Sequence, residues 1–294
     1  MEWINSIRSP NLTIFFQYIT WLGYKDFLFL FVPFCFWFFD RKVFGTFTLF
    51  VFISALINTY LKDFFQDPRP DVLLNIDPWA STIDLSYGFP SGHAQLAIAI
   101  WGFLFLNTKN IFLKILFIFL ILAISFSRIY LGVHDISDVI GGIIFGLISI
   151  FLLNALLGDK GSWIRNLSNL KHFLIYLSCI SLFYLTWPEG GDKIVSVALG
   201  SLVIGFFIGQ IIDSKYFKFE SPQNLAIKVS STILALIGFI QLNRSVDQIL
   251  EIINFNHNIE AVASSLLLGL YISLIAPLML SFLRLQTKKI DRLS

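Results

Sequence analysis

Long apolar runs separated by short polar loops recur along the whole chain. A run of about 20 apolar residues can cross a bilayer as a helix, and lipid leaves the backbone few other ways to satisfy its hydrogen bonds. Several runs are shorter than this, so the predicted number of about nine spanning helices carries an error of one. The expected spans are Phe27–Phe39, Val43–Phe64, His93–Leu106, Ile111–Phe126, Ile136–Leu157, Phe173–Trp187, Ile194–Ile212, Ala226–Leu242 and Ala261–Leu283.

The first 24 residues have a different pattern, in which apolar residues recur at helical spacing among polar ones. That pattern is typical of amphipathic helices lying in the membrane interface. We therefore expect an all-α, polytopic membrane helix bundle with three parts. These are an interfacial segment (1–24), a core (25–158) with five spanning helices, and a C-terminal extension (159–294) with about four further spanning helices. The role of the extension is unassigned.

Charge supports a membrane protein with a defined orientation. Hydrophobic residues make up 56% of the chain and charged residues 14%, which excludes an ordinary soluble domain, and the net charge of +2 is too small to indicate nucleic acid binding. If every expected helix crosses, the basic clusters fall on one side, which the positive-inside rule makes cytoplasmic. These clusters include Arg41–Lys42, Lys109–Lys114, Lys215–Lys228 and Lys288–Arg292. The N-terminus is then outside and the C-terminus cytoplasmic.

Three polar clusters fall on the opposite, outer side, beside the loop Gln66–Phe89. The first is Lys62 followed by Arg69-Pro70, the second is Pro90-Ser91-Gly92-His93, and the third is Ser127-Arg128 with His134 and Asp138. Each cluster lies where an expected spanning helix begins or ends. Together they would form one site at the depth of the lipid headgroups.

The cations and the helix start suit a phosphate group. Lys62, Arg69 and Arg128 supply three positive charges, and guanidinium groups bind two phosphate oxygens at once. Ser91 and Gly92 open the third expected span, where free backbone N–H groups favour an anion. Each feature also has an ordinary structural interpretation, because cations anchor span ends at the interface and serine commonly caps helices.

Two histidines complete the predicted chemistry. His134 and Asp138 are four residues apart, so on a helix they share a face, which fits a histidine held by a carboxylate or a local structural contact. Asp138 lies just inside an apolar run, where an unpaired carboxylate is costly and usually marks function. We expect His134 to attack phosphorus, oriented by Asp138, and His93 to protonate the leaving oxygen and then activate water. No metal-binding cluster and no cofactor are expected.

At these residues the sequence resembles the type 2 phosphatidic acid phosphatase superfamily of lipid phosphate phosphatases, whose three motifs match Lys62–Pro70, Pro90–His93 and Ser127–Asp138. The resemblance covers about residues 25–157. It implies that His134 is the nucleophile, that His93 is the general acid, and that the remaining matched residues bind phosphate or support it. Two features differ from the commonest six-span members: only two expected spans precede Lys62, and about four follow the core.

The expected activity is metal-free hydrolysis of a lipid phosphate monoester or diphosphate through a phosphohistidine. Candidate substrates are phosphatidate, phosphatidylglycerol phosphate, sphingoid-base phosphate, undecaprenyl diphosphate and lipid A phosphate. One alternative is phosphotransfer from the same intermediate to a lipid acceptor, and another is a channel or transporter, which polar residues at mid-span would favour. The expected setting is a bacterial inner membrane, with the site on the periplasmic or extracytoplasmic face. The oligomeric state is left open.

Overall fold

The computed structural model describes residues 2–80, 86–158, 161–191, 193–253, 256–283, 285, 287 and 288. Contacts divide the chain into two compact units. Unit 1 comprises Met1–Phe29, Ser54–Asn166 and Trp187–Gly191, and unit 2 comprises Leu30–Ile53, Leu167–Thr186 and Asp192–Ser294. The units interleave along the chain, because α2 and α3 each begin in one and end in the other. The expected division at residue 158 stays a prediction.

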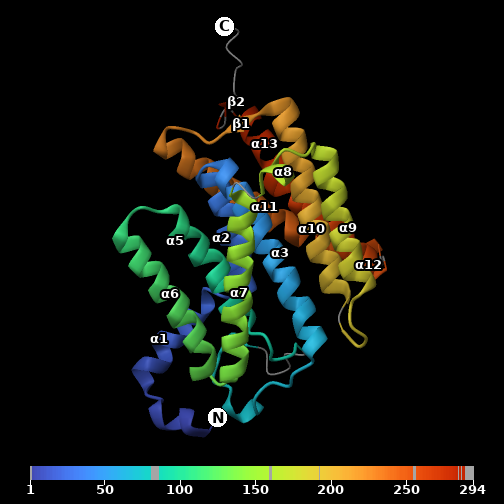
Figure 1. Cartoon of the computed structure of the whole chain (residues 1–294). Helices are drawn as coiled ribbons and strands as arrows, with labels where there is room; N and C mark the ends of the chain where they lie inside the picture. The colour runs from blue at the N-terminus through green and yellow to red at the C-terminus, as the bar shows by residue number, and fades with distance from the viewer. Residues whose placement is uncertain are drawn as a thin grey trace. The chain divides into compact units, whose positions relative to one another are not determined.

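Helices make up almost all of the described chain (Figure 1). As far as α8, the helices are η1 (Glu2–Ile7), α1 (Pro10–Trp21), α2 (Lys25–Phe38), α3 (Arg41–Phe65), η2 (Val72–Leu74), α4 (Gly92–Ala97), η3 (Ile98–Gly102), α5 (Phe103–Asn107), α6 (Ile111–Tyr130), α7 (Ile136–Leu157) and α8 (Ser162–Arg165). The later elements are α9 (Asn169–Leu185), α10 (Lys193–Ile212), η5 (Asp213–Phe217), β1 (Phe219–Glu220), α11 (Leu225–Ile253), α12 (His257–Leu270), η6 (Tyr271–Ile275), α13 (Ala276–Phe282) and β2 (Thr287–Lys288). Strands β1 and β2 pair antiparallel over two residues each.

Six helical segments of the described chain are long and apolar enough to cross a membrane: Arg41–Phe65, Ile111–Tyr130, Ile136–Leu157, Lys193–Phe217, Leu225–Leu250 and Asn258–Phe282. Helices α1 and α2 meet this criterion only as a pair, bent by 51°. The segments Gly92–Asn107 and Asn169–Leu185 are apolar but shorter. The helical membrane fold is confirmed, whereas the predicted number of nine spanning helices is not.

Parts of several expected loops lie outside the described residues. They include residues 81–85 of the outer loop and residues 289–294 of the basic C-terminal tail. The orientation inferred from the basic clusters therefore stays a prediction.

Helix α1 packs lengthwise on α6 in unit 1. The ring of Phe16 lies 5.4 Å from that of Phe126 and 4.6 Å from that of Tyr130, and Phe15 lies 6.4 Å from Phe119. Aromatic pairs at these separations add to the free energy gained by burying the rings. The segment expected in the interface is therefore tied to α6, and the break between α1 and α2 is held close to the end of α6.

Two glycines allow α7 to lie against the turn that precedes α4. A Cβ atom at Gly142 would lie 2.5 Å from the carbonyl oxygen of Ser91, and one at Gly141 would overlap the ring of Phe89. Small residues permit such close approach between membrane helices. The second polar cluster is therefore fixed by direct backbone packing against α7.

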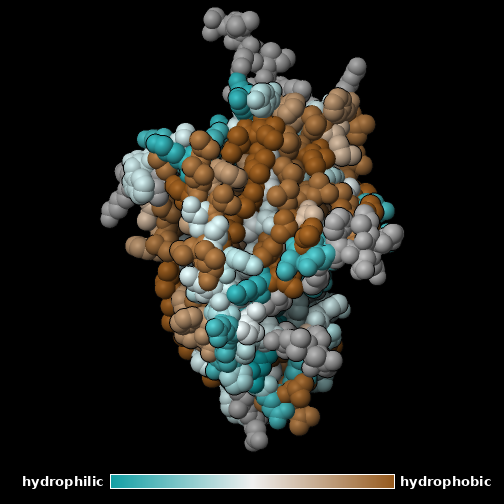
Figure 2. All heavy atoms as spheres, turned by 90° about the vertical axis from the view of Figure 1, so that its right-hand side faces the viewer, coloured by the Kyte–Doolittle hydropathy of each residue, from teal (hydrophilic) through white to brown (hydrophobic). Residues whose placement is uncertain are grey.

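In unit 2, α10 and α12 also meet through glycines. A Cβ atom at Gly205 would overlap the carbonyl of Leu266, and one at Gly269 would overlap that of Leu202. Around this contact Phe36, Phe206 and Phe239 belong to one buried aromatic and aliphatic cluster. Hydrophobic side chains cover most of the upper part of the face shown in Figure 2, as expected for helices that contact lipid.

We predict that Gly142→Ala destabilises the protein by about 1–3 kcal/mol, because the added methyl group meets backbone that cannot rotate away. Thermal unfolding in detergent would measure this as a lower Tm. Leu147→Ala is the matched control on the same helix, since Leu147 is 55% exposed. Equal Tm values for the two variants would contradict the close packing of α7 on this turn.

Candidate active site

The third polar cluster is built where α6 ends and α7 begins. The chain reverses at Gly132, whose φ of 76° favours glycine, and the backbone N–H of His134 donates to the carbonyl of Arg128 (3.2 Å). The turn therefore places His134 just beyond the end of one spanning helix and just before the next.

Asp138 holds His134 from the first turn of α7. Its Oδ2 lies 3.0 Å from Nδ1 of His134 and also accepts from the backbone N–H of Asp135 (3.0 Å). Both side chains of the pair are almost completely buried. An ionised carboxylate only accepts, so the proton of the neutral ring belongs on Nδ1, which leaves the lone pair of Nε2 for other chemistry.

Burial and nearby charge keep His134 neutral. The pKa of His134 lies well below its usual range, first because burial disfavours the charged ring. The charges of Lys62, Arg69 and Arg128 lower this pKa further. All three predicted cations are therefore close enough to the histidine to affect its titration.

In the second cluster, Ser91 directly precedes the first residue of α4. The N–H of Ser91 donates to the backbone carbonyl of Asp138 (2.9 Å), which joins the second cluster to the third. Its hydroxyl is buried and has no hydrogen-bond partner among the described residues. Gly92 faces Asn58, where a Cβ atom would lie 2.9 Å from Oδ1.

A buried amide network ties the second cluster to α3. Asn58 donates to the carbonyl of Pro90 (3.2 Å) and to Oε1 of Gln95 (2.9 Å), and Gln95 donates to the carbonyl of Ser54 (3.0 Å). Buried amides that satisfy each other fix a local geometry. The polar helix start is therefore held on two sides, by α3 and by α7.

His93 lies on the other side of this helix start. Its ring packs edge to face on Tyr24, with centroids 4.6 Å apart, at the break between α1 and α2. Its Nε2 is buried and has no hydrogen-bond partner among the described residues. A buried polar atom without a partner costs about 1–3 kcal/mol, which a ligand that supplies the partner would recover.

The first cluster holds the loop that precedes Phe89. The ammonium of Lys62 donates to the carbonyls of Tyr87 and Gly88, the latter at 3.4 Å. Arg69 donates to the carbonyl and hydroxyl of Ser86 (2.8 and 2.7 Å) and to the carbonyl of Val133 (3.3 Å). These cations connect the first cluster to the third and to the loop that leads into the second.

Arg128 is held by groups that the motifs do not include. It forms a buried ion pair with Asp77 (2.7 Å) and donates to the hydroxyl of Thr20, and its guanidinium lies 5.4 Å from the centroid of Tyr24. Tyr24 donates to the same carboxylate of Asp77 (2.6 Å). The Nε of Arg128 is buried and has no partner among the described residues.

The eight predicted site residues therefore gather at one end of unit 1, where α3 and α6 end and α7 begins (Figure 1). Sequence reasoning missed Thr20, Tyr24 and Asp77. Asp77 is one of several acidic residues in the outer loop, and no spacing distinguished it from the others. The described residues contain no group of three or more His, Cys, Asp or Glu side chains able to hold a metal.

A loop that follows α9 also contacts this end of α3. The indole N–H of Trp187 donates to the buried carboxylate of Asp63 (2.8 Å), and its ring packs edge to face on Tyr60 at 5.4 Å. Gln66 donates to the carbonyl of Glu189 (2.9 Å). Residues of the C-terminal half thus brace the helix turn that carries Lys62.

Comparisons with known proteins identify a family of similar sequences. A model described as the PAP2 superfamily matches residues 43–162, and one described as the transmembrane extension of PAP2 superfamily phosphatases matches residues 197–288. Phosphatidylglycerophosphatase B of Bacillus subtilis is 31% identical over 160 residues, which are 50% of this chain and 76% of that protein. Dihydrosphingosine 1-phosphate phosphatase C823.11 of Schizosaccharomyces pombe is 28% identical over 244 residues, 74% of this chain.

The chain spans 55% of the length of the S. pombe relative. The crystal structure of Aquifex aeolicus LpxE is 29% identical and covers 51% of this chain and 89% of that one. Its TM-score is 0.44, which is too low for a detailed comparison of the two folds.

We predict that Trp187→Phe lowers stability by about 1.5–3 kcal/mol, because the phenyl ring cannot donate to the buried carboxylate of Asp63. Thermal unfolding in detergent would measure the loss. Trp163→Phe is the matched control, since Trp163 is 66% exposed. If both substitutions changed Tm equally, the Trp187 hydrogen bond would not brace α3.

Proposed function

Because the chain belongs to the PAP2 superfamily, we propose that it is an integral-membrane lipid phosphate phosphatase. Its relatives are named for different lipids, a sphingoid-base phosphate in one and a phosphatidylglycerol phosphate in another. The proposed substrate class is therefore a membrane lipid with a terminal phosphate. The observation that carries the proposal is the 3.0 Å pair of His134 and Asp138 beside three cations.

In the first step, the Nε2 lone pair of His134 attacks phosphorus. The bond from phosphorus to the lipid oxygen breaks, its electron pair stays on that oxygen, and protonated His93 donates a proton there. Asp138 stabilises the charge that develops on the imidazole. The lipid alcohol leaves, and the phosphoryl group stays on His134.

In the second step, His93 takes a proton from water while the water oxygen attacks phosphorus. The bond between phosphorus and Nε2 breaks, its electron pair returns to the ring, and inorganic phosphate leaves. Lys62, Arg69 and Arg128 balance the charge of the phosphate oxygens throughout, so the mechanism has no need of a metal ion. The Ser91 hydroxyl and the Arg128 Nε, neither of which has a hydrogen-bond partner in the described part of the chain, offer two further donors.

We also propose that the site lies on the outer, periplasmic or extracytoplasmic face of a bacterial inner membrane, with a cytoplasmic C-terminus. The support is the set of basic clusters on the opposite side of the expected topology. A site at the helix ends places the phosphate at headgroup depth while the lipid tails stay in the hydrocarbon.

We predict that the purified protein in detergent releases inorganic phosphate, with EDTA present, from at least one of five lipids. The lipids are phosphatidate, phosphatidylglycerol phosphate, sphingosine 1-phosphate, undecaprenyl diphosphate and lipid A. His134→Ala removes the nucleophile and should abolish release, whereas His172→Ala on α9 should retain it. Release by the His134 variant, or loss with EDTA, would reject the mechanism. Phosphate moving only to a lipid acceptor would indicate phosphotransfer.

We predict that Asp138→Asn lowers kcat by about 10² to 10⁴, because an amide neither fixes the same ring tautomer nor balances the imidazolium charge. KM should change much less, since Asp138 contacts the histidine and not the lipid. Steady-state kinetics on the best lipid substrate would measure both constants. Asp135→Asn is the matched control on the same turn, and an equal loss in that variant would remove Asp138 from the proposed role.

A further inference from the structure

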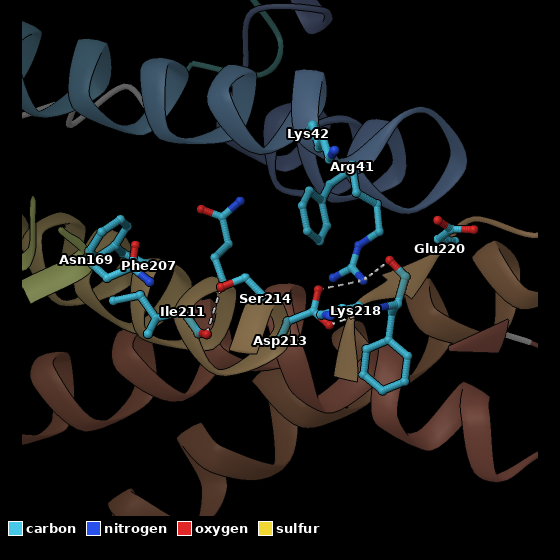
Figure 3. A pocket seen from close by; sticks show the side chains of 12 residues that line it. Arg41, Lys42, Asn169, Phe207, Ile211, Asp213, Ser214, Lys218 and Glu220 are labelled. Atoms are coloured by element: carbon cyan, nitrogen blue, oxygen red, sulfur yellow. Dashed lines mark hydrogen bonds and ion pairs between the residues drawn. The ribbon is translucent and has the colours of Figure 1, made fainter. Parts of the chain in front are cut away.

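Unit 2 contains a cavity of about 460 Å³ that the proposed hydrolysis does not use (Figure 3). It opens where α3 and α9 begin and α10 ends, and η5 and β1 complete its wall. Its volume falls in the range of small-ligand sites. The polar lining includes Arg41, Lys42, Gln210, Asp213, Lys218 and Glu220.

Arg41 forms the rigid inner wall of this cavity. Its side chain is only 10% exposed, and its Nη1 pairs with the carboxylate of Asp213 at 3.0 Å. Its Nη2 donates to the carbonyl of Ser273 at 2.8 Å, and the guanidinium lies 4.7 Å from the ring centroid of Phe36. The charge of Arg41 is therefore balanced within the protein, and its position is fixed.

Unused donors remain around this wall. The Nε of Arg41 is buried without a hydrogen-bond partner among the described residues. Within the same part of the chain, the side chains of Lys42 and Gln210 make no hydrogen bond or ion pair. A buried donor without a partner is rare in folded proteins, so the position of the Arg41 Nε beside a cavity indicates a ligand that carries acceptor oxygens.

The turn after η5 brings a second lysine to the cavity. Lys218 adopts a left-handed conformation (φ 51°), its N–H donates to the carbonyl of Asp213 (2.7 Å), and Asp213 Oδ1 accepts from the N–H of Phe219 (3.0 Å). The charged residues that line the cavity are three cations, Arg41, Lys42 and Lys218, and two carboxylates, Asp213 and Glu220. The cavity thus retains a net positive charge.

The position of the cavity identifies the source of such a ligand. The cavity lies at helix ends that the basic clusters assign to the cytoplasmic side, and basic pockets between membrane helices on that side bind lipid headgroups. Its apolar wall includes Phe207, whose ring contacts Tyr176 of α9 at 4.8 Å.

We propose that this cavity binds the phosphodiester group of a membrane phospholipid from the cytoplasmic leaflet. Lys42 and Lys218 contact the phosphate oxygens, and the Nε of Arg41 and the amide of Gln210 supply further hydrogen bonds. No histidine or cysteine of the described chain lines the cavity, so the lipid is bound rather than hydrolysed. The proposal does not depend on the phosphatase activity, because it concerns a different unit and a different phosphate chemistry.

The test uses the full chain in neutral detergent, titrated with phosphatidylglycerol and analysed by native mass spectrometry. The double variant Lys42→Ala/Lys218→Ala should bind this lipid about 30-fold more weakly, at roughly a factor of five for each lysine. The variant Lys42→Arg/Lys218→Arg keeps both positive charges and should bind phosphatidylglycerol as tightly as the unaltered protein. Lys109→Ala/Lys114→Ala is the matched control, since these lysines lie in another expected cytoplasmic loop and should not affect the site.

Three further binding measurements distinguish between the possible ligands. Phosphatidylcholine reports on a zwitterionic headgroup with the same phosphodiester, and its binding should weaken in the same double variant. Millimolar inorganic phosphate should not displace phosphatidylglycerol, and displacement would overturn the lipid assignment in favour of a free-anion site. Vanadate, which mimics the transition state of a phosphohistidine enzyme, should also leave the lipid bound. Unchanged lipid binding by a double variant of native Tm would overturn the proposal.

Discussion

The buried carboxylate of Asp138 is the feature on which the rest of unit 1 depends. A charge one turn inside a membrane helix is costly unless other groups satisfy it, and here Oδ2 accepts from the ring of His134 and from the N–H of Asp135. The backbone carbonyl of the same residue accepts from Ser91. One residue therefore orients the proposed nucleophile and fixes the start of α4, where the proposed phosphate donors lie.

The three cations have structural partners as well as a proposed chemical role. Lys62 and Arg69 donate to carbonyls in residues 86–88, and Arg128 is paired with Asp77. Such partners hold long flexible side chains in place before a ligand arrives, which lowers the entropy lost on binding. A phosphate that takes some of these hydrogen bonds must compete with backbone oxygens. The geometry thus favours a strongly charged group, such as a phosphate monoester, over a weakly charged one.

The sequence was sufficient for the parts of the site that rest on local spacing. His134 and Asp138 are four residues apart, and the turn that joins them follows from Gly132 and the start of α7. Charge, the expected topology and the matched motifs together suggested that Lys62, Arg69 and Arg128 share one site, and all three affect the pKa of His134.

Contacts between distant segments could not be predicted from the spacing of residues in the sequence. Arg128 and Asp77 are 51 residues apart and Trp187 and Asp63 are 124 apart, so neither pair follows from helical spacing. The number of crossings is uncertain for a related reason. Length and composition do not determine whether a bent pair such as α1 and α2, or a short helix such as α9, passes through the bilayer.

Two buried arginines show how similar local structure leads to different chemistry. Arg128 in unit 1 and Arg41 in unit 2 each pair with one aspartate and lie near an aromatic ring, and the Nε of each has no hydrogen-bond partner among the described residues. The difference lies in their neighbours. Arg128 lies close enough to His134 to lower its pKa, whereas lysines and an amide surround Arg41. A phosphate beside Arg128 faces a nucleophile and a proton donor, so its bonds can be exchanged. A phosphate beside Arg41 meets lysines and an amide but no histidine among the described lining residues, and such a site can hold a phospholipid without altering it.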